Sequence, residues 1–171
     1  MPDLNLYNES LKNADLKDKS IIMPLMSWDI YSNYYQDLKA QNADFSQLTD
    51  LKIGYNWDLK IDLLEELQNN DTILVTNVDL KIEFASQGIL EMTGYLPEEV
   101  IGKSPKMFQG EKTSEEKRQQ IKEAILAQKP FEATVVNYRK SGETYDCHIR
   151  SFPVFNKKGQ LSHFIALEKA A

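Results

Sequence analysis

The sequence is short of several residue types and patterns, and each shortage excludes a class of protein. Its single cysteine, Cys147, cannot form a disulfide within the chain, which fits a reducing compartment. No apolar run approaches the roughly 20 residues that a helix needs to cross a bilayer, and no basic segment followed by an apolar block marks a secretory signal. Repeats, glycine-rich phosphate loops and metal-ligand spacings are also missing. We therefore expect a cytoplasmic protein without a bound metal.

The net negative charge is confined to the N-terminal part of the chain. Residues 1–70 carry 12 acidic and 6 basic side chains, whereas residues 71–171 carry 14 of each. An acidic extension is repelled by phosphate backbones and anionic lipids, so we expect no nucleic-acid partner and no membrane partner. A length of 171 residues suits one domain with its own core plus an extension.

Residues 1–70 have the composition and periodicity of a helical extension. Residues 1–20 are polar and are predicted to be a flexible lead-in. From Ser27, aromatic and aliphatic residues recur at helical spacing, which predicts a helix that ends near Asn42 and two shorter helices before residue 70. We therefore predict an N-terminal helical cap over residues 21–70, which serves either as a structural subdomain or as a dimerisation or signal-relay cap.

From Asp71 the pattern changes to strands separated by turns. Short helices are predicted after the first two strands, one capped by Ser86, one begun by Pro97 and a longer one from Thr113 to Gln128. This order predicts an α+β fold, in which short helices cover one face of an antiparallel sheet. The predicted strands cover residues 72–76, 81–85, 131–140, 143–155 and 160–168.

Seven sequence blocks in residues 71–171 occur in the same order as in a PAS domain. They read TILVTN, IEFAS, MTGY, PEEVIGKS, MFQG, NYRKSGE and FPVFNKKG. This part of the chain resembles the PAS superfamily and, within it, the light-oxygen-voltage (LOV) branch. The resemblance implies a PAS-like five-stranded antiparallel sheet wrapped by short helices around a central pocket, in a module that senses a small ligand or binds a partner.

One residue departs from the LOV branch at its reactive position. LOV domains carry a cysteine in the block that here reads GKSPKMFQG, residues 102–110, and that cysteine forms a light-driven adduct with flavin. Pro105 stands at its place and has no reactive atom, so adduct photochemistry is not expected there. Cys147 is not expected to replace it, because strand alternation turns its neighbours Asp146 and His148 to the opposite face. We expect Cys147 to be a small apolar filler.

The resemblance also names five pocket positions that contact flavin in the family. Gln109 and Asn137 match the family's polar contacts, whereas Ser104 and Cys147 replace asparagines and Glu168 replaces a glutamine. A buried Glu168 would place a negative charge beside the flavin unless it were protonated or paired. We expect no cofactor, with flavin (FMN) as the alternative, and we interpret Gln109 and Asn137 as ties between helix and sheet.

The same strand alternation places many apolar side chains on the outer face of the sheet. Such a face is too apolar to be left in water, so we expect the N-terminal helices, a second subunit or both to cover it. We predict a homodimer in which both take part. The predicted interface residues are Val136, Tyr138, Phe152, Ile165 and Leu167 of the sheet, with Trp28, Tyr31, Tyr35 and Leu64 of the extension.

The first functional interpretation is a sensory or regulatory PAS module that is not an enzyme. It would act by small-ligand sensing, by protein–protein association or by both, and it would signal to an unknown partner protein. We expect either a stand-alone adaptor or a fragment of a longer signalling protein. One alternative is a flavin-binding photosensor that works by photoreduction, without a cysteinyl adduct. Another is a purely structural dimerisation scaffold whose pocket is filled by Phe84, Met92, Met107, Phe108 and Phe131.

Overall fold

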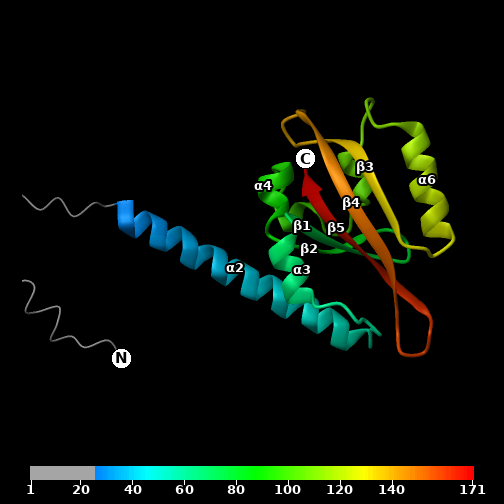
Figure 1. The fold of residues 1–171 in the computed structure, drawn as a ribbon, viewed down its shortest axis with the longest axis horizontal. Coiled ribbons are helices and arrows are strands. Elements are labelled where there is room, and N and C mark those ends of the chain that lie inside the picture. Colours follow the sequence, from blue (N-terminus) through cyan, green and yellow to red (C-terminus); the bar gives the residue numbers. More distant parts are fainter. Residues whose placement is uncertain (1–25) are drawn as a thin grey trace, which may run out of the picture. The chain divides into compact units, whose positions relative to one another are not determined.

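The structure is a computed structural model that describes the backbone of residues 26–171 and the side chains from residue 39 onward (Figure 1). The predicted lead-in, residues 1–20, lies outside the described residues, as do the side chains of Trp28, Tyr31 and Tyr35. Gln36–Ala171 forms one compact unit.

The five strands form one antiparallel sheet with the spatial order β2-β1-β5-β4-β3. The last strand in the sequence thus lies at the centre, where it pairs with β1 on one side and with β4 on the other. The predicted α+β fold with a five-stranded antiparallel sheet is confirmed. The strands are β1 (Thr72–Asn77), β2 (Ile82–Ala85), β3 (Phe131–Tyr138), β4 (Thr144–Phe155) and β5 (Leu161–Ala170).

Four short helices connect β2 to β3. Proline opens both α5 and η1, where its fixed φ suits the first helical turn and its missing N–H costs nothing. Ser86 does not cap the first of these helices as predicted, because its Oγ instead accepts a hydrogen bond from the Ile73 amide at 2.9 Å. The helices are α4 (Ile89–Thr93), α5 (Pro97–Val100), the 3₁₀ helix η1 (Pro105–Phe108) and α6 (Glu115–Leu126).

The N-terminal extension is simpler than predicted. The two helices expected on either side of Asn42 are one helix, α2 (Met26–Gly54), since neither proline nor glycine interrupts residues 27–53. A second helix, α3 (Leu63–Asn69), begins at Asp62, whose Oδ1 accepts from the Leu64 amide at 2.9 Å.

The outer face of the sheet is covered by the chain's own residues. Of the predicted interface residues, Ile165 and Leu167 are buried and Phe152 packs against the same cluster. Leu64 is 40% exposed, because α3 turns Leu63 and Leu67 toward the sheet instead. The cluster on this face comprises Leu48, Trp57, Leu63, Leu67, Ile73, Val75, Phe84, Val154, Ile165 and Leu167.

Val136 and Tyr138 are half-buried on β3, at the edge of the sheet. The Tyr138 hydroxyl accepts a hydrogen bond from the Lys112 amide at 2.9 Å, and the Val136 carbonyl accepts one from Thr113 Oγ1 at 2.6 Å. The loop before α6 is thereby fixed to β3. A role for these residues between two chains stays a prediction.

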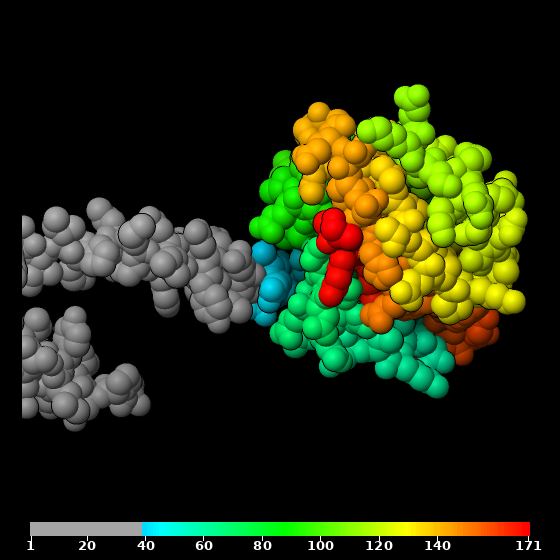
Figure 2. Space-filling view, turned by 45° about the horizontal axis from the view of Figure 1, so that its top comes forward, coloured from blue at the N-terminus to red at the C-terminus, as the bar shows by residue number. Residues whose placement is uncertain are grey.

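A buried histidine joins the segment after α2 to the sheet. Trp57 Nε1 donates to His163 Nδ1 at 3.1 Å, and His163 Nε2 lies 3.1 Å from Glu83 Oε2. Tyr55 donates its hydroxyl to the same Glu83 oxygen at 3.2 Å. In the space-filling view the teal segment of residues 55–58 lies against the orange turn between β4 and β5 (Figure 2). There the backbone of Trp57 forms an isolated antiparallel β-bridge with Asn156. These contacts hold residues 55–58 on the outer face of the sheet.

Candidate functional site

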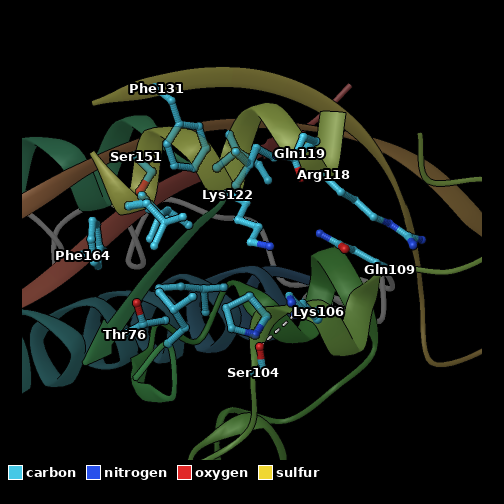
Figure 3. Close-up of a pocket in the computed structure, with 18 of the residues that line it drawn as sticks. Thr76, Ser104, Lys106, Gln109, Arg118, Gln119, Lys122, Phe131, Ser151 and Phe164 are labelled. Atoms are coloured by element: carbon cyan, nitrogen blue, oxygen red, sulfur yellow. Dashed lines mark hydrogen bonds between the residues drawn. The ribbon is translucent and has the colours of Figure 1, made fainter. Parts of the chain in front are cut away.

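A cavity of about 620 Å³ opens on the inner face of the sheet, against η1 and α6 (Figure 3). Its volume lies within the range of roughly 300–1,000 Å³ that small-molecule sites occupy. Its apolar lining includes Leu74, Phe131, Ile149 and Phe164. Its polar and charged lining includes Ser104, Lys106, Gln109, Arg118, Lys122 and Glu168.

The block GKSPKMFQG places four residues at this cavity through the short helix η1: Ser104, Pro105, Lys106 and Gln109. Ser104 caps the helix, with its Oγ 3.5 Å from the Lys106 amide, and Pro105 takes the first helical position. Gln109 ends the helix. Because the helix has a single turn, Pro105, Lys106 and Gln109 all come to line the same cavity.

Helix α6 contributes cationic groups to the opposite wall. Arg118 and Lys122 lie four residues apart and therefore share a helix face. Figure 3 shows the Lys122 side chain reaching into the cavity, with Gln109 on the facing side. Arg118 binds the Gly110 carbonyl and lies 3.3 Å from Glu115, yet its buried Nε has no hydrogen-bond partner among the described residues. Glu115 also lines the cavity, but the three cations Lys106, Arg118 and Lys122 outnumber it and leave the rim with a net positive charge.

Glu168 supplies a buried carboxyl at the sheet side of the cavity. It is 5% exposed, and its Oε2 lies 3.5 Å from Cys147 Sγ. Burial raises the pKa of Glu168 from 4.5 to about 7, although the Cys147 hydrogen bond acts in the opposite direction. Burial, followed by the nearby Glu168 charge, raises the pKa of the Cys147 thiol as well. The thiol is therefore held in its unreactive, protonated form.

Asn137 and Cys147 lie beside the cavity rather than in its lining. Cys147 packs with Met92, Val135 and Tyr145 in a small cluster of buried residues. Asn137 is paired with Tyr145 across β3 and β4, and both Asn137 Oδ1 and the Tyr145 hydroxyl are buried without a hydrogen-bond partner in the described part of the chain. Buried polar atoms of this kind cost stability unless a partner satisfies them.

Four of the five large side chains that could have filled the pocket pack elsewhere. Phe84 belongs to the outer-face cluster, Met92 to the Cys147 cluster, and Phe108 and Met107 to a third cluster under α4 and α5. Of the five residues, Phe131 lines the cavity. The pocket is therefore open, unlike that of the predicted filled scaffold.

A family model described as the PAS domain matches residues 70–169 of the chain. The chain belongs to the PAS domain family. The predicted membership is confirmed, and this PAS domain is a sensory signalling module that is similar to parts of proteins named TWIN LOV 1 and blue-light-activated histidine kinase.

Two curated relatives of this PAS domain carry light-related names. Protein TWIN LOV 1 of Arabidopsis thaliana is 42% identical over 107 residues, which are 61% of this chain and 27% of the relative. The blue-light-activated histidine kinase of Brucella canis is 38% identical over 97 residues, which are 55% of this chain and 20% of the relative. The chain thus spans about a quarter or less of the length of these relatives.

Solved LOV structures share the fold of this PAS domain. The dark structure of the blue-light photoreceptor Aureochrome1 LOV superimposes with a TM-score of 0.61 at 24% identity, covering 67% of this chain and 86% of that one. The LOV domain of the Erythrobacter litoralis EL346 blue-light activated histidine kinase gives a TM-score of 0.55 at 22% identity, covering 58% and 94%. At these identities the likeness shows the fold alone.

The predicted site residues of the PAS domain divide into two groups. Ser104, Gln109 and Glu168 line the cavity, whereas Asn137 and Cys147 lie in the layer next to it. Sequence reasoning missed the positive rim formed by Lys106, Arg118 and Lys122. The spacing of Arg118 and Lys122 on one helix face was the available signal, but charged helix faces usually point to water.

The part of the PAS domain that the structure describes lacks two further features. It contains no group of three or more His, Cys, Asp or Glu residues that could hold a metal ion. It also contains no helix long and apolar enough to cross a membrane.

Proposed function

We propose that this PAS domain is a sensor that binds flavin mononucleotide in its inner-face cavity and works without a cysteinyl adduct. The single observation that carries the proposal is the open cavity of about 620 Å³, with apolar walls and a positive rim. The expectation of no cofactor, drawn from the sequence, gives way here to its alternative. One LOV structure of the same fold is described with a flavin analogue, and this supports the choice of ligand class.

The lining fits the three chemical parts of a flavin mononucleotide. The apolar faces of its ring would contact Leu74, Phe131, Ile149 and Phe164. The carbonyl and N–H groups of its polar edge would meet Gln109 and Glu168. Its phosphate would be held by Lys106, Arg118 and Lys122, whose charges complement it. When bound, the flavin would supply blue-light absorption and a ring that can be reduced.

The chain's own residues support a response that does not involve a covalent bond. Pro105, at the place of the family's cysteine, lines the cavity but offers no nucleophile. Cys147 is buried beside Glu168, and its raised pKa keeps the thiol protonated. Neither residue is therefore suited to form the adduct.

Binding is tested by titrating purified ligand-free protein with flavin mononucleotide and following the quenching of flavin fluorescence. We expect saturable binding to one site per chain and yellow protein after dialysis. Lys122→Glu should weaken binding by about tenfold or more, since it reverses one charge of the rim. Glu111→Gln, an exposed change outside the cavity, should leave the affinity unchanged. Protein that stays colourless and leaves flavin fluorescence unchanged would contradict the proposal.

A second proposal concerns association of the domain with a copy of itself. The first half of α2 carries Trp28, Tyr31 and Tyr35 within eight residues, a density of aromatic groups that favours contact with protein rather than water. A homodimer built with α2 would use these residues and would relay the state of the cavity to a signalling partner. Light scattering at micromolar concentration tests it: a mass twice 19.7 kDa supports the dimer, and a mass of 19.7 kDa contradicts it.

A further inference from the structure

Glu168 is the deepest charged group on the cavity wall. It lies on the central strand β5, is 5% exposed, and faces the cavity. Its Oε2 is occupied by the Cys147 thiol at 3.5 Å. Among the described residues, no side chain or backbone group forms a hydrogen bond with its Oε1. One carboxyl oxygen is therefore free to contact a ligand.

The charged groups around Glu168 do not neutralise it. Strand β1 presents Thr72 opposite it, and β4 presents Cys147 and Tyr145, all of which are uncharged. The ion pairs of the described residues include none to Glu168. The remaining titratable groups that line the cavity are Glu115, Arg118 and Lys122 from α6 and Lys106 from η1.

We propose that Glu168 links flavin binding to proton uptake: the cavity takes the flavin with Glu168 as the neutral acid, whose O–H donates to a carbonyl oxygen of the ring. This inference rests on the proposed function and names the residue that sets its pH dependence. No covalent bond forms or breaks except the O–H bond of the carboxyl, and its proton comes from solvent.

The energetic reason is the loss of water at Oε1. A ligand that fills the cavity removes the solvent that would stabilise a carboxylate, and its ring carbonyls would face the negative charge. A neutral carboxyl avoids both costs and gains a hydrogen bond. In the ligand-free protein burial already raises the pKa of Glu168 to about 7, so above neutral pH the carboxyl must gain a proton on binding.

The resemblance to LOV domains implies a glutamine at this position in that family. The Glu168 carboxyl would behave differently from such a glutamine. A glutamine amide can donate a hydrogen bond at any pH, whereas a carboxyl can do so only when protonated. Glu168 thus makes the occupancy of the cavity depend on pH in a range where the glutamine side chain would not.

The experiment measures flavin mononucleotide affinity from pH 6.5 to pH 8.5 for the native chain and for Glu168→Gln. For one linked proton and a free-protein pKa of about 7, the native dissociation constant should rise about 25-fold over this range. The Glu168→Gln constant should change by less than about threefold. Both proteins use the same ligand, so titration of its phosphate cancels in the comparison. Calorimetry at pH 8 in two buffers of different ionisation enthalpy should show uptake of close to one proton by the native chain and none by Glu168→Gln.

The possible results separate the inference from the function on which it rests. Native affinity that is independent of pH, or a Glu168→Gln variant with the native slope, would overturn the inference and leave flavin binding intact. A failure of both proteins to bind at every pH would overturn the proposed function, and the proton linkage with it. Binding by Glu168→Gln alone would show that the native carboxyl stays ionised, which also overturns the proton uptake.

Discussion

Leu48 offers a direct test of whether the second half of α2 is part of the sensory domain's core. Its side chain is fully buried and packs in the outer-face cluster with residues of β1 and β5. Replacing a buried leucine by alanine costs about 2–5 kcal/mol, from lost burial and from the cavity that remains. For Leu48→Ala we expect a loss of about 3 kcal/mol in the free energy of unfolding, which is more than a hundredfold in the unfolding equilibrium.

Ile53→Ala on the same helix is the matched control. Ile53 is 67% exposed, so its truncation should change the free energy of unfolding by no more than about 0.5 kcal/mol. Urea unfolding followed by tryptophan fluorescence and by circular dichroism measures both variants and tests for a single transition. A Leu48→Ala loss below about 1 kcal/mol, or an equal loss for Ile53→Ala, would refute the packing of α2 on the sheet.

Three further predictions concern stability and use the same unfolding assay. The first compares the native chain with Glu168→Gln, both without ligand. In the folded native chain the pKa of Glu168 is raised to about 7, so the carboxyl contributes stability that is fully present below pH 4.5 and is lost as the pH rises through about 7. The native chain should therefore lose about 3 kcal/mol relative to the variant between pH 4 and pH 8, and a constant difference would count against the buried acid. Trp57→Phe removes the indole N–H, which donates to both His163 Nδ1 and Ser162 Oγ, and it also shrinks a buried side chain. It should therefore cost about 2 kcal/mol, and a loss below about 0.5 kcal/mol would contradict these contacts. Gly88→Ala should destabilise by about 2 kcal/mol or more, because a Cβ would lie 1.8 Å from the Asp71 carbonyl oxygen, whereas Gly54→Ala meets no atom within 4 Å and should be neutral or stabilising. Equal effects at the two glycines would contradict the close approach.

The sequence predicted the sheet well because each strand carries its own local signal. Alternating β-branched residues and short glycine-bearing turns define hairpins without reference to the rest of the chain. Alternation along β5 accounts for the position of Glu168 at the cavity and of Ile165 and Leu167 in the outer-face cluster. Helix boundaries were less well predicted: α2 runs through Asn42, since a polar residue alone does not stop a helix.

The cavity itself was not predictable from local patterns. Whether Phe84, Met92 and Phe108 fill the pocket or pack elsewhere depends on which elements meet, and the structure places all three in separate clusters. The positive rim likewise combines η1 with α6, which are separated in sequence by a loop.

The sequence by itself determined the strand order along the chain, the two faces of the sheet, and the lack of a nucleophilic side chain at Pro105. Those features follow from residue type and from a period of two, which are properties of short segments. The tertiary structure alone decided that the inner face keeps an open cavity and that Lys106, Arg118 and Lys122 line it with a buried Glu168. It did so because burial and charge proximity arise only when distant segments pack together, and these two quantities set what the cavity can bind.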